Sequence, residues 1–274
     1  MQVEYRSADA VEPELAESLT QCFEGYLVPA HFDRLTIAKM VRVDSVDLSA
    51  SVVAQHEGRT IGVALVARRG WTCRLAAMAI APDFRGQRVG TGLTDFLICS
   101  AQERGDRAFV LEVIEQNAPG MRLYQAAGFT PVRRLFGYTA DAIETKEDPA
   151  LAEIDPVEVA MAVSRWGVES LPYQISPATL TALAPPYRAF RLGPAAAVVS
   201  SPATETITIC TLVVEPGARR LGWASRMVGA LSARFTGKKW RIPILIPEEI
   251  PVAFFTRLGF RKEPLNQIQM KCPL

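Results

Sequence analysis

The sequence predicts an α+β protein made of two tandem copies of one domain, each with a mixed, mostly antiparallel sheet flanked by helices. An internal repeat is the first observation. IAPDFRGQRVG at 80–90 returns as VEPGARRLGWA at 214–224, each with a proline, an arginine three residues later and a glycine-bearing turn. LYQAAGF at 123–129 likewise returns as FFTRLGF at 254–260. The second observation is that both copies combine strand-like runs with helical apolar spacing.

The elements of the first copy follow from its apolar periodicity. Residues 89–104 place Val89, Leu93 and Leu97 at helical spacing. SVVAQH at 51–56 alternates as a half-buried strand does. Gly128 is a natural residue to end the helix before it. The predicted strands are 3–6, 51–56, 61–69, 72–81, 108–114 and 132–138, and the predicted helices are 12–24, 35–44, 89–104 and 118–126.

An acidic segment separates the two copies. Between residues 139 and 156, six acidic residues meet one lysine, with prolines at 149 and 156. This composition predicts a linker over 141–156, between a first domain at 1–140 and a second at 157–274. In the second copy we expect helices up to 184 and at 218–235 and 250–257, and strands near 187–191, 195–201, 206–214, 240–246 and 267–272.

Composition excludes several classes of protein. The 274 residues have a formal net charge of +1 and no dense basic tract, so nothing favours a nucleic-acid partner. The five cysteines lie far apart without a CxxC pair, and the two histidines fit no ligand spacing with them. We therefore predict no metal site and no disulfide framework. The start of the chain has no apolar signal core, and the apolar runs are too short to span a bilayer, so we expect a cytoplasmic protein without a membrane partner.

The stretch APDFRGQRVGTGL at 81–93 suits a phosphate. Glycine permits a tight turn, successive main-chain N–H groups form an anion-binding nest, and the following helix adds its unsatisfied N–H groups and its dipole. The GxGxxG and GxxxxGK[ST] patterns do not match. A connection that merely needs glycine is the alternative. The predicted diphosphate-binding residues are Arg85, Gly86, Gln87, Arg88, Val89, Gly90 and Thr91.

The pattern V-x-P-x-x-R-G-x-G-x-G/A resembles the GNAT superfamily of N-acetyltransferases. Pro82, Arg85, Gly86 and Gly90 are in register, whereas Arg88 replaces a usual glycine. The second copy matches with Pro216, Arg219, Gly222 and Ala224. The resemblance implies acetyl-CoA as co-substrate, and a strand edge whose main chain at Met78, Ala79 and Ile80 binds the pantetheine arm and polarises the thioester.

LEV at 111–113, followed by Asn117 and LYQAAGF, resembles the ribosomal-protein alanine N-acetyltransferases. The resemblance implies that Glu112 is the general base, Tyr124 the general acid and Asn117 a cofactor contact. Such groups meet a physical need, because deprotonating a lysine-like amine at pH 7 costs on the order of 4–5 kcal/mol. Alternatives remain for each: Glu112 pairs with an arginine, Tyr124 is a core aromatic, Asn117 only caps a helix, and Arg88 is a surface charge.

The second copy lacks both predicted catalytic groups. Phe255 stands in place of Tyr124, and Pro243 in place of Glu112. We therefore expect the first domain to transfer the acetyl group to a primary amine by direct attack, and the second to be catalytically silent. A non-catalytic acyl-CoA sensor or interaction module is the alternative, and another acyl donor is also open. The chain is expected to be a monomer or homodimer. Phe23, Tyr26, Phe32 and Trp71 are either acceptor-site or core residues.

Overall fold

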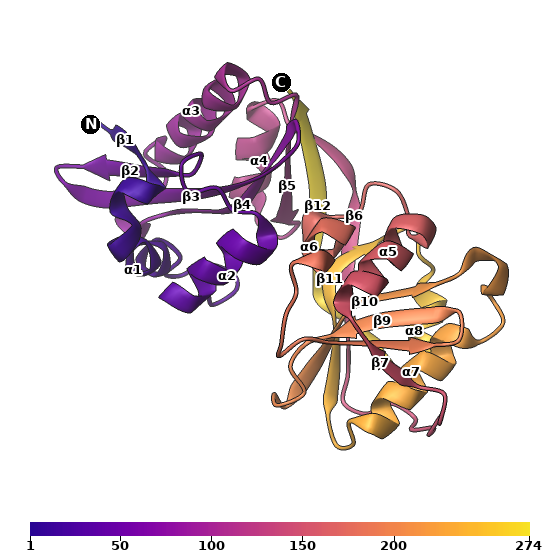
Figure 1. The fold of residues 1–274 in the computed structure, drawn as a ribbon. Coiled ribbons are helices and arrows are strands. Elements are labelled where there is room, and N and C mark those ends of the chain that lie inside the picture. Colours follow the sequence, from indigo (N-terminus) through magenta and orange to yellow (C-terminus); the bar gives the residue numbers. More distant parts are fainter. The chain divides into compact units, whose positions relative to one another are not determined.

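The chain forms two compact units. The computed structural model describes residues 1–274, apart from the side chains of Glu12 and Pro13. The first unit comprises Met1–Arg133 together with Ile268–Leu274, and the second comprises Arg134–Gln267 (Figure 1). Each unit has its own hydrophobic core and its own set of helices and strands.

The first unit contains most of the elements that the sequence predicts, within a few residues. Its helices cover both faces of one sheet. The strands are β1 (Glu4–Ser7), β2 (Val52–His56), β3 (Arg59–Arg69), β4 (Thr72–Ile80), β5 (Ala108–Ile114) and the beginning of β6 (Thr130–Ala140), and the helices are α1 (Glu12–Cys22), α2 (Arg34–Asp44), α3 (Val89–Glu103) and α4 (Ala118–Ala126).

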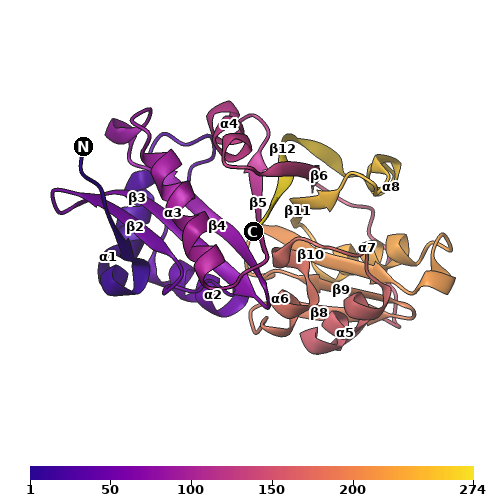
Figure 2. The same cartoon turned by 90° about the horizontal axis from the view of Figure 1, so that it is seen from above.

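The first sheet runs in the order β1-β2-β3-β4-β5. Its neighbours are antiparallel except for β4 and β5, which are parallel. Helices α3 and α4 lie on one face and α1 and α2 on the other (Figures 1 and 2). Apolar residues of α3, such as Leu93 and Leu97, are fully buried with Phe109 and Leu111 of β5. The face that carries α3 therefore holds the main core of this unit.

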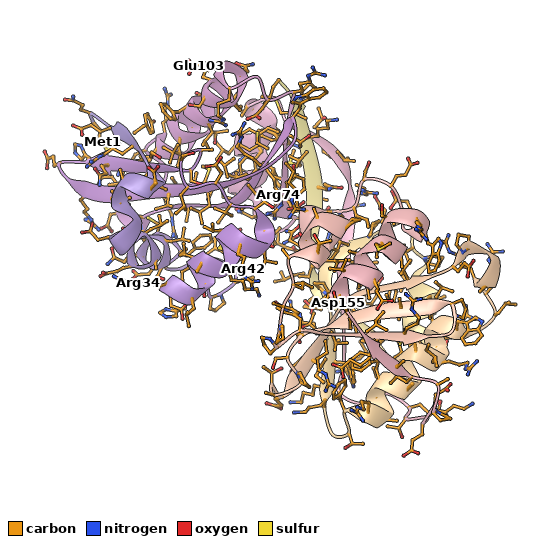
Figure 3. The ribbon with its side chains drawn as sticks, viewed as in Figure 1. Met1, Arg34, Arg42, Arg74, Glu103 and Asp155 are labelled. Atoms are coloured by element: carbon orange, nitrogen blue, oxygen red, sulfur yellow. The ribbon has the colours of Figure 1, made fainter. Side chains whose placement is uncertain are left out.

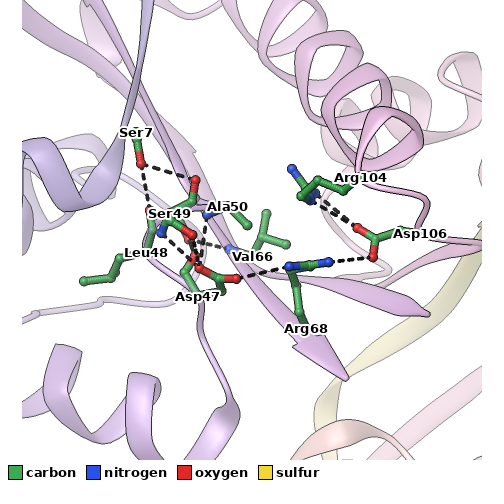
Figure 4. A network of polar contacts seen from close by, with 10 residues as sticks. Ser7, Asp47, Leu48, Ser49, Ala50, Val66, Arg68, Arg104 and Asp106 are labelled. Atoms are coloured by element: carbon green, nitrogen blue, oxygen red, sulfur yellow. Dashed lines mark hydrogen bonds and ion pairs between the residues drawn. The ribbon is translucent and has the colours of Figure 1, made fainter. Parts of the chain in front are cut away.

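A polar network joins the end of β3 to the start of β5 (Figure 4). Arg68 at the end of β3 contacts Asp47 at 3.4 Å and the buried Asp106 at 3.2 Å. Arg104, after α3, contacts the other oxygen of Asp106 at 3.3 Å. Because Asp106 stands just before β5, these pairs tie the start of β5 to the end of β3.

The last strand of the chain completes the first unit. Ile268, Met270 and Cys272 of β12 (Arg261–Pro273) belong to the buried core of that unit. Thr130 Oγ1 donates a hydrogen bond to the carbonyl of Lys271 at 3.2 Å. The units therefore divide differently from the predicted domains 1–140 and 157–274. The reason is that β12 supplies apolar side chains to a core more than a hundred residues upstream in sequence.

The second unit repeats the arrangement of the first. Its sheet runs in the order β6-β11-β10-β9-β8-β7, and β10 and β11 are parallel. Helices α7 and α8 pack on one side of the core, and α5 and α6 on the other. The strands are β7 (Ala152–Ile154), β8 (Arg188–Leu192), β9 (Ala195–Val199), β10 (Thr206–Val214) and β11 (Lys239–Pro247), and the helices are α5 (Pro156–Trp166), α6 (Pro177–Thr181), α7 (Trp223–Arg234) and α8 (Val252–Arg257).

The acidic segment 141–156 is packed onto the second unit, in contrast to the predicted linker. Ile143 is buried in the core, and the N–H of Lys146 donates to the carbonyl of Gly229 at 3.2 Å. Strand β7 pairs with β8. Composition predicted a linker because acidic residues dominate, but the few apolar residues between them are enough to anchor the segment.

Helix α7 begins later than the sequence predicts. The helix predicted at 218–235 begins only at Trp223, because residues 216–222 form a short 3-10 turn and the glycine-bearing loop. Among the described residues, no helix has the length and apolarity needed to cross a membrane.

Candidate active site

Strands β4 and β5 separate partway along their length. They pair only from Thr72 with Ala108 to Leu75 with Leu111. A register shift in the pairing with β3 makes Ala76 a bulge, and beyond it Met78–Ile80 pair with β3 alone. Bulges bend a strand away from its neighbour. The predicted splayed edge at Met78, Ala79 and Ile80 is therefore present, with main-chain groups facing the gap.

The glycine-bearing turn follows this edge directly. Gly86 has a φ of +76° and Arg88 a φ of +64°, so two residues of the turn adopt the left-handed conformation. The first helical bond of α3 runs from the N–H of Gly92 to the carbonyl of Arg88 at 3.0 Å. The N–H groups of Val89, Gly90 and Thr91 therefore precede the helical ladder and point out of the helix end. Gln87 and Arg88 are exposed in the same turn.

The side chain of Arg85 is engaged by main-chain carbonyls. Its Nε donates to the carbonyl of Ile80 at 2.9 Å, and its Nη2 donates to Cys22 at 3.1 Å and to Glu24. Cys22 ends α1, and Glu24 lies in the loop before α2. Arg85 thus joins the end of β4 to the loop after α1, and this structural contact is one that the sequence did not predict.

Asn117 links two parts of the site. Its Oδ1 accepts the N–H of Gly120 at 3.1 Å, which caps α4, and its Nδ2 donates to the hydroxyl of Tyr26 at 3.3 Å. The helix-cap alternative is confirmed, and the second bond brings the loop after α1 against the start of α4. Tyr26 also packs edge-on against Phe23, whose ring contacts Phe32.

Tyr124 lies on α4, half-buried against the core of the first unit. Burial, with a smaller contribution from nearby Tyr26, raises the pKa of its phenol well above the usual value. The phenol therefore keeps its proton over the whole physiological range. A proton donor to a departing thiolate requires this protonation state.

Glu112 lies in β5 and forms a buried ion pair with Arg74 of β4. Arg74 Nε and Nη2 approach Glu112 Oε2 at 2.7 and 2.6 Å. The two side chains are 1% (Glu112) and 7% (Arg74) exposed. The expected alternative, a pairing with an arginine, is therefore what the structure shows. Figure 3 labels Arg74 within the first unit.

The structure places the two predicted catalytic side chains on opposite faces of the sheet. Side chains alternate along a strand, and Phe109, Leu111 and Val113 of β5 point into the core beneath α3. Glu112 therefore points to the face of α1 and α2. Tyr124 packs with the core beneath α3.

The second unit reproduces the geometry without the two groups. β10 has a bulge at Cys210, pairs with β11 only over Thr206–Thr208, and is followed by a turn with Arg220 and Gly222 at positive φ. Aligning the parallel pairs, Thr72–Ala108 with Thr206–Lys239, places Pro243 at the position of Glu112. Phe255 is buried and stacks on Tyr138.

Comparison with known proteins identifies the domain. Residues 12–129 match the Acetyltransferase (GNAT) family, within the first unit. The first unit is a GNAT domain. The chain is 34% identical over 93 residues to N-alpha-acetyltransferase 30 of Schizosaccharomyces pombe, covering 32% of this chain and 62% of that protein. It is 30% identical over 90 residues to the spore coat polysaccharide biosynthesis protein SpsD of Bacillus subtilis, covering 33% and 31%. The chain thus spans less than two thirds of either relative.

Solved structures extend the likeness to the whole chain. A GCN5-related N-acetyltransferase from Sphaerobacter thermophilus has a TM-score of 0.70 at 13% identity, covering 99% of this chain and 95% of its own. A tandem GNAT protein from the clavulanic acid biosynthesis pathway has a TM-score of 0.66 at 14% identity, covering 99% and 98%. At such identities the likeness concerns the fold, which is that of two GNAT-like units in one chain.

Sequence reasoning missed Arg74 and the role of Arg85. A signal for the first was available, since Arg74 and Glu112 are charges of opposite sign within two apolar runs that the GNAT fold pairs in parallel. Cys73 on the same strand is buried, and burial raises the pKa of its thiol to about 12. It is a packed strand cysteine. Among the described residues, no cluster of three or more potential metal ligands is found.

Proposed function

We propose that the first unit transfers an acetyl group from acetyl-CoA to a primary amine by direct attack. The observation that carries the proposal is the separation of β4 from β5, because the free edge at Met78–Ile80 leads directly into the turn at residues 85–91. Tyr124 of α4 packs against the core of the same unit. The turn would hold the diphosphate, and the strand edge would hold the pantetheine amides.

Each catalytic group has one task in this proposal. Glu112 takes a proton from the attacking ammonium, directly or through a water molecule, because only the neutral amine attacks a thioester. Tyr124 gives its proton to the departing thiolate, and the second proton that the nitrogen loses as the amide forms restores the phenol. The main chain of Met78–Ile80 polarises the thioester carbonyl. Asn117 contributes indirectly, since it caps the helix that carries Tyr124.

The test is release of free thiol from acetyl-CoA in the presence of a panel of amines. We expect Glu112→Gln to lower kcat by about 10²–10⁴-fold at neutral pH. Glu103→Gln is the matched control, since Glu103 is exposed at the last residue of α3 (Figure 3), whereas the turn precedes the first residue of that helix. Binding of acetyl-CoA without turnover across the panel would refute the proposal.

A second candidate is a non-catalytic acyl-CoA-binding module. The buried ion pair between Arg74 and Glu112 favours it, because a carboxylate held by a guanidinium gives up charge-assisted bonds when it takes a proton. Under this candidate the pair only joins β4 to β5. Replacing both partners of the pair by apolar residues separates the two candidates.

A further inference from the structure

Trp71 lies on the surface of the first unit, in the hairpin that joins β3 to β4. It is 63% exposed, although the large apolar area of its ring makes tryptophan a largely buried residue in most proteins. Thr72 begins β4, and the free edge at Met78–Ile80 lies at the other end of that strand. Trp71 is therefore neither a core residue nor an acceptor-site residue, the two alternatives that the sequence left open.

The guanidinium of Arg107 lies over the ring of Trp71, with Cζ 3.5 Å from the ring centroid. Main-chain bonds hold both residues in place. The N–H of Arg107 donates to the carbonyl of Trp71 at 2.7 Å, and the carbonyl of Arg107 accepts the N–H of Leu274 at 3.2 Å. Because the backbone positions both residues, the stacked pair is organised before any partner binds.

The charge of Arg107 is not neutralised by a neighbouring acid. Both oxygens of the preceding Asp106 are taken, one by Arg68 and one by Arg104 (Figure 4). Glu103 is exposed four residues earlier and makes no ion pair with Arg107. Among the described side chains, no carboxylate lies within ion-pair distance of Arg107. Stacking uses the face of the guanidinium and leaves the N–H groups at its edge for an anion.

Another arginine–tryptophan pair in the chain shows what is missing at Trp71. Arg226 lies over the ring of Trp223, with Cζ 4.2 Å from the ring centroid. Its Nη2 contacts Oδ2 of Asp148 at 2.7 Å, so the chain itself supplies the carboxylate. A carboxylate from another molecule would complete the pair at Trp71 in the same way.

We propose that Trp71 and Arg107 form a docking site for an acidic segment of a partner protein. A carboxylate of the segment binds the edge of Arg107, and a neighbouring apolar side chain packs on Trp71. Tryptophan and arginine are the side chains that most often contribute strongly at protein interfaces. A nucleic acid is disfavoured, because its backbone requires several available cations and Arg68 and Arg104 are already paired.

The inference goes beyond the proposed acetyl transfer and does not depend on it. The pair precedes the first residues of β4 and β5, whereas the two strands separate after Leu75 and Leu111. Loss of docking and loss of acetyl transfer are therefore separate outcomes.

Fluorescence anisotropy of a labelled octapeptide of alternating Glu and Phe tests the proposal on the full chain. We expect saturable binding that weakens as salt is added, since an exposed ion pair is screened. Arg107→Gln should weaken the affinity about tenfold, and Trp71→Ser about fivefold. Arg226→Gln removes the other stacked arginine and is the matched control, which should bind as the wild type does.

Two further measurements keep the test decisive. Both substituted side chains are exposed, so thermal unfolding should show unchanged midpoints for the variants. The octapeptide should also reduce acrylamide quenching of tryptophan fluorescence in the wild-type chain, a readout that needs no substitution.

The same peptide with Lys in place of Glu, and an oligothymidylate of about eight nucleotides, should each bind at least about tenfold more weakly. Absence of binding by the Glu peptide, equal binding by Arg107→Gln and the wild type, or equal affinity for the oligothymidylate would each overturn the proposal.

Discussion

Glu112 forms an ion pair that joins β4 to β5, and under the proposed function the same side chain also takes a proton. The ion pair with Arg74 is 1% exposed on the Glu112 side, so neither charge can be left alone without a large penalty. Loss of activity in a single substitution therefore does not identify a base. Replacing both charged residues by apolar residues of similar size tests the base without leaving a buried charge unpaired.

The first prediction follows from this pair. Arg74→Met should lower the free energy of unfolding by about 3–5 kcal/mol, because it leaves a buried carboxylate without its cation. The double variant Arg74→Met/Glu112→Leu should recover most of that loss, since both charges are replaced by apolar groups. Urea unfolding measures both.

Activity of the same double variant decides the role of Glu112. If Glu112 is the base, the refolded double variant transfers no acetyl group even though it is stable. Wild-type turnover in the double variant would contradict a catalytic Glu112 and support the non-catalytic role of this pair.

The second prediction concerns the phenol of Tyr124. Burial raises its pKa above the usual value near 10, so at pH 10 it still carries the proton that an ordinary tyrosine has half lost. The activity should therefore show no alkaline loss from this group below about pH 10. Tyr124→Phe should lower kcat and remove one phenolate from the ultraviolet titration only above that pH. If Tyr124→Phe instead removes a phenolate that titrates near pH 10, the raised pKa of Tyr124 is contradicted.

Among the elements, the loop after α1 depends on the turn after β4. The guanidinium of Arg85 holds the carbonyls of Cys22 and Glu24, and Tyr26 follows in the same loop. The second unit has a similar contact, because Arg219 donates to the carbonyls of Trp166 and Val214. The arginine of the repeated motif thus positions a neighbouring loop in both units.

The third prediction tests that positioning. Arg85→Lys keeps the charge but loses the planar fork that reaches three carbonyls. Hydrogen exchange of the amides at residues 22–26 should accelerate, and KM for the amine should rise more than kcat falls. Arg219→Lys is the control and should change exchange only near Trp166. Unchanged exchange at 22–26 would show that Arg85 does not hold the loop.

The fourth prediction concerns the start of α3. Arg88 adopts a φ of +64°, a conformation that costs a residue with a Cβ about 1 kcal/mol or more. Arg88→Gly should therefore stabilise the first unit by about 1 kcal/mol. The reciprocal Gly222→Ala, at a φ of +83°, should destabilise the second by a similar amount. Thermal unfolding of both variants checks the pair, and equal midpoints would argue against strain at these turns.

The sequence predicted where helices and strands lie better than which side chains contact one another. The predicted ranges 108–114 and 118–126 match β5 and α4, because a short apolar run marks the strand and Gly128 marks the end of the helix. The turn was also foreseen, from glycine and arginine alone. A pairing of Glu112 with an arginine was an open alternative, but the identity of that arginine as Arg74 and the contacts of Arg85 were not predicted. Each contact joins residues far apart in sequence through side-chain direction, which periodicity does not encode.

For the whole molecule, the order of elements along the chain does not define the units. Strand β12 ends in the first unit, and β6 passes from the first unit into the sheet of the second, where it pairs with β11. Nothing in the apolar pattern of 267–272 distinguishes a strand that stays with its neighbours from one that completes a distant core. Sequence therefore predicted two copies correctly but not which residues complete each.

The last prediction concerns a chain without the end of β12, which contributes core residues to the first unit. A chain ending at Gln267 would lack Ile268, Met270 and Cys272, which are 6%, 0% and 8% exposed in the core of the first unit. Because each lost large apolar side chain costs about 2–5 kcal/mol, the first unit should unfold or lose most of its stability, and acetyl transfer should fall with it. Limited proteolysis should cut first within residues 1–133 and leave 134–267 intact.

The triple variant Ile268→Ser/Met270→Ser/Cys272→Ser keeps chain length and should behave like the truncated chain. Lys271→Ser, at an exposed position of the same strand, should not. Full activity in the truncated chain would mean that β12 is dispensable to the unit it completes.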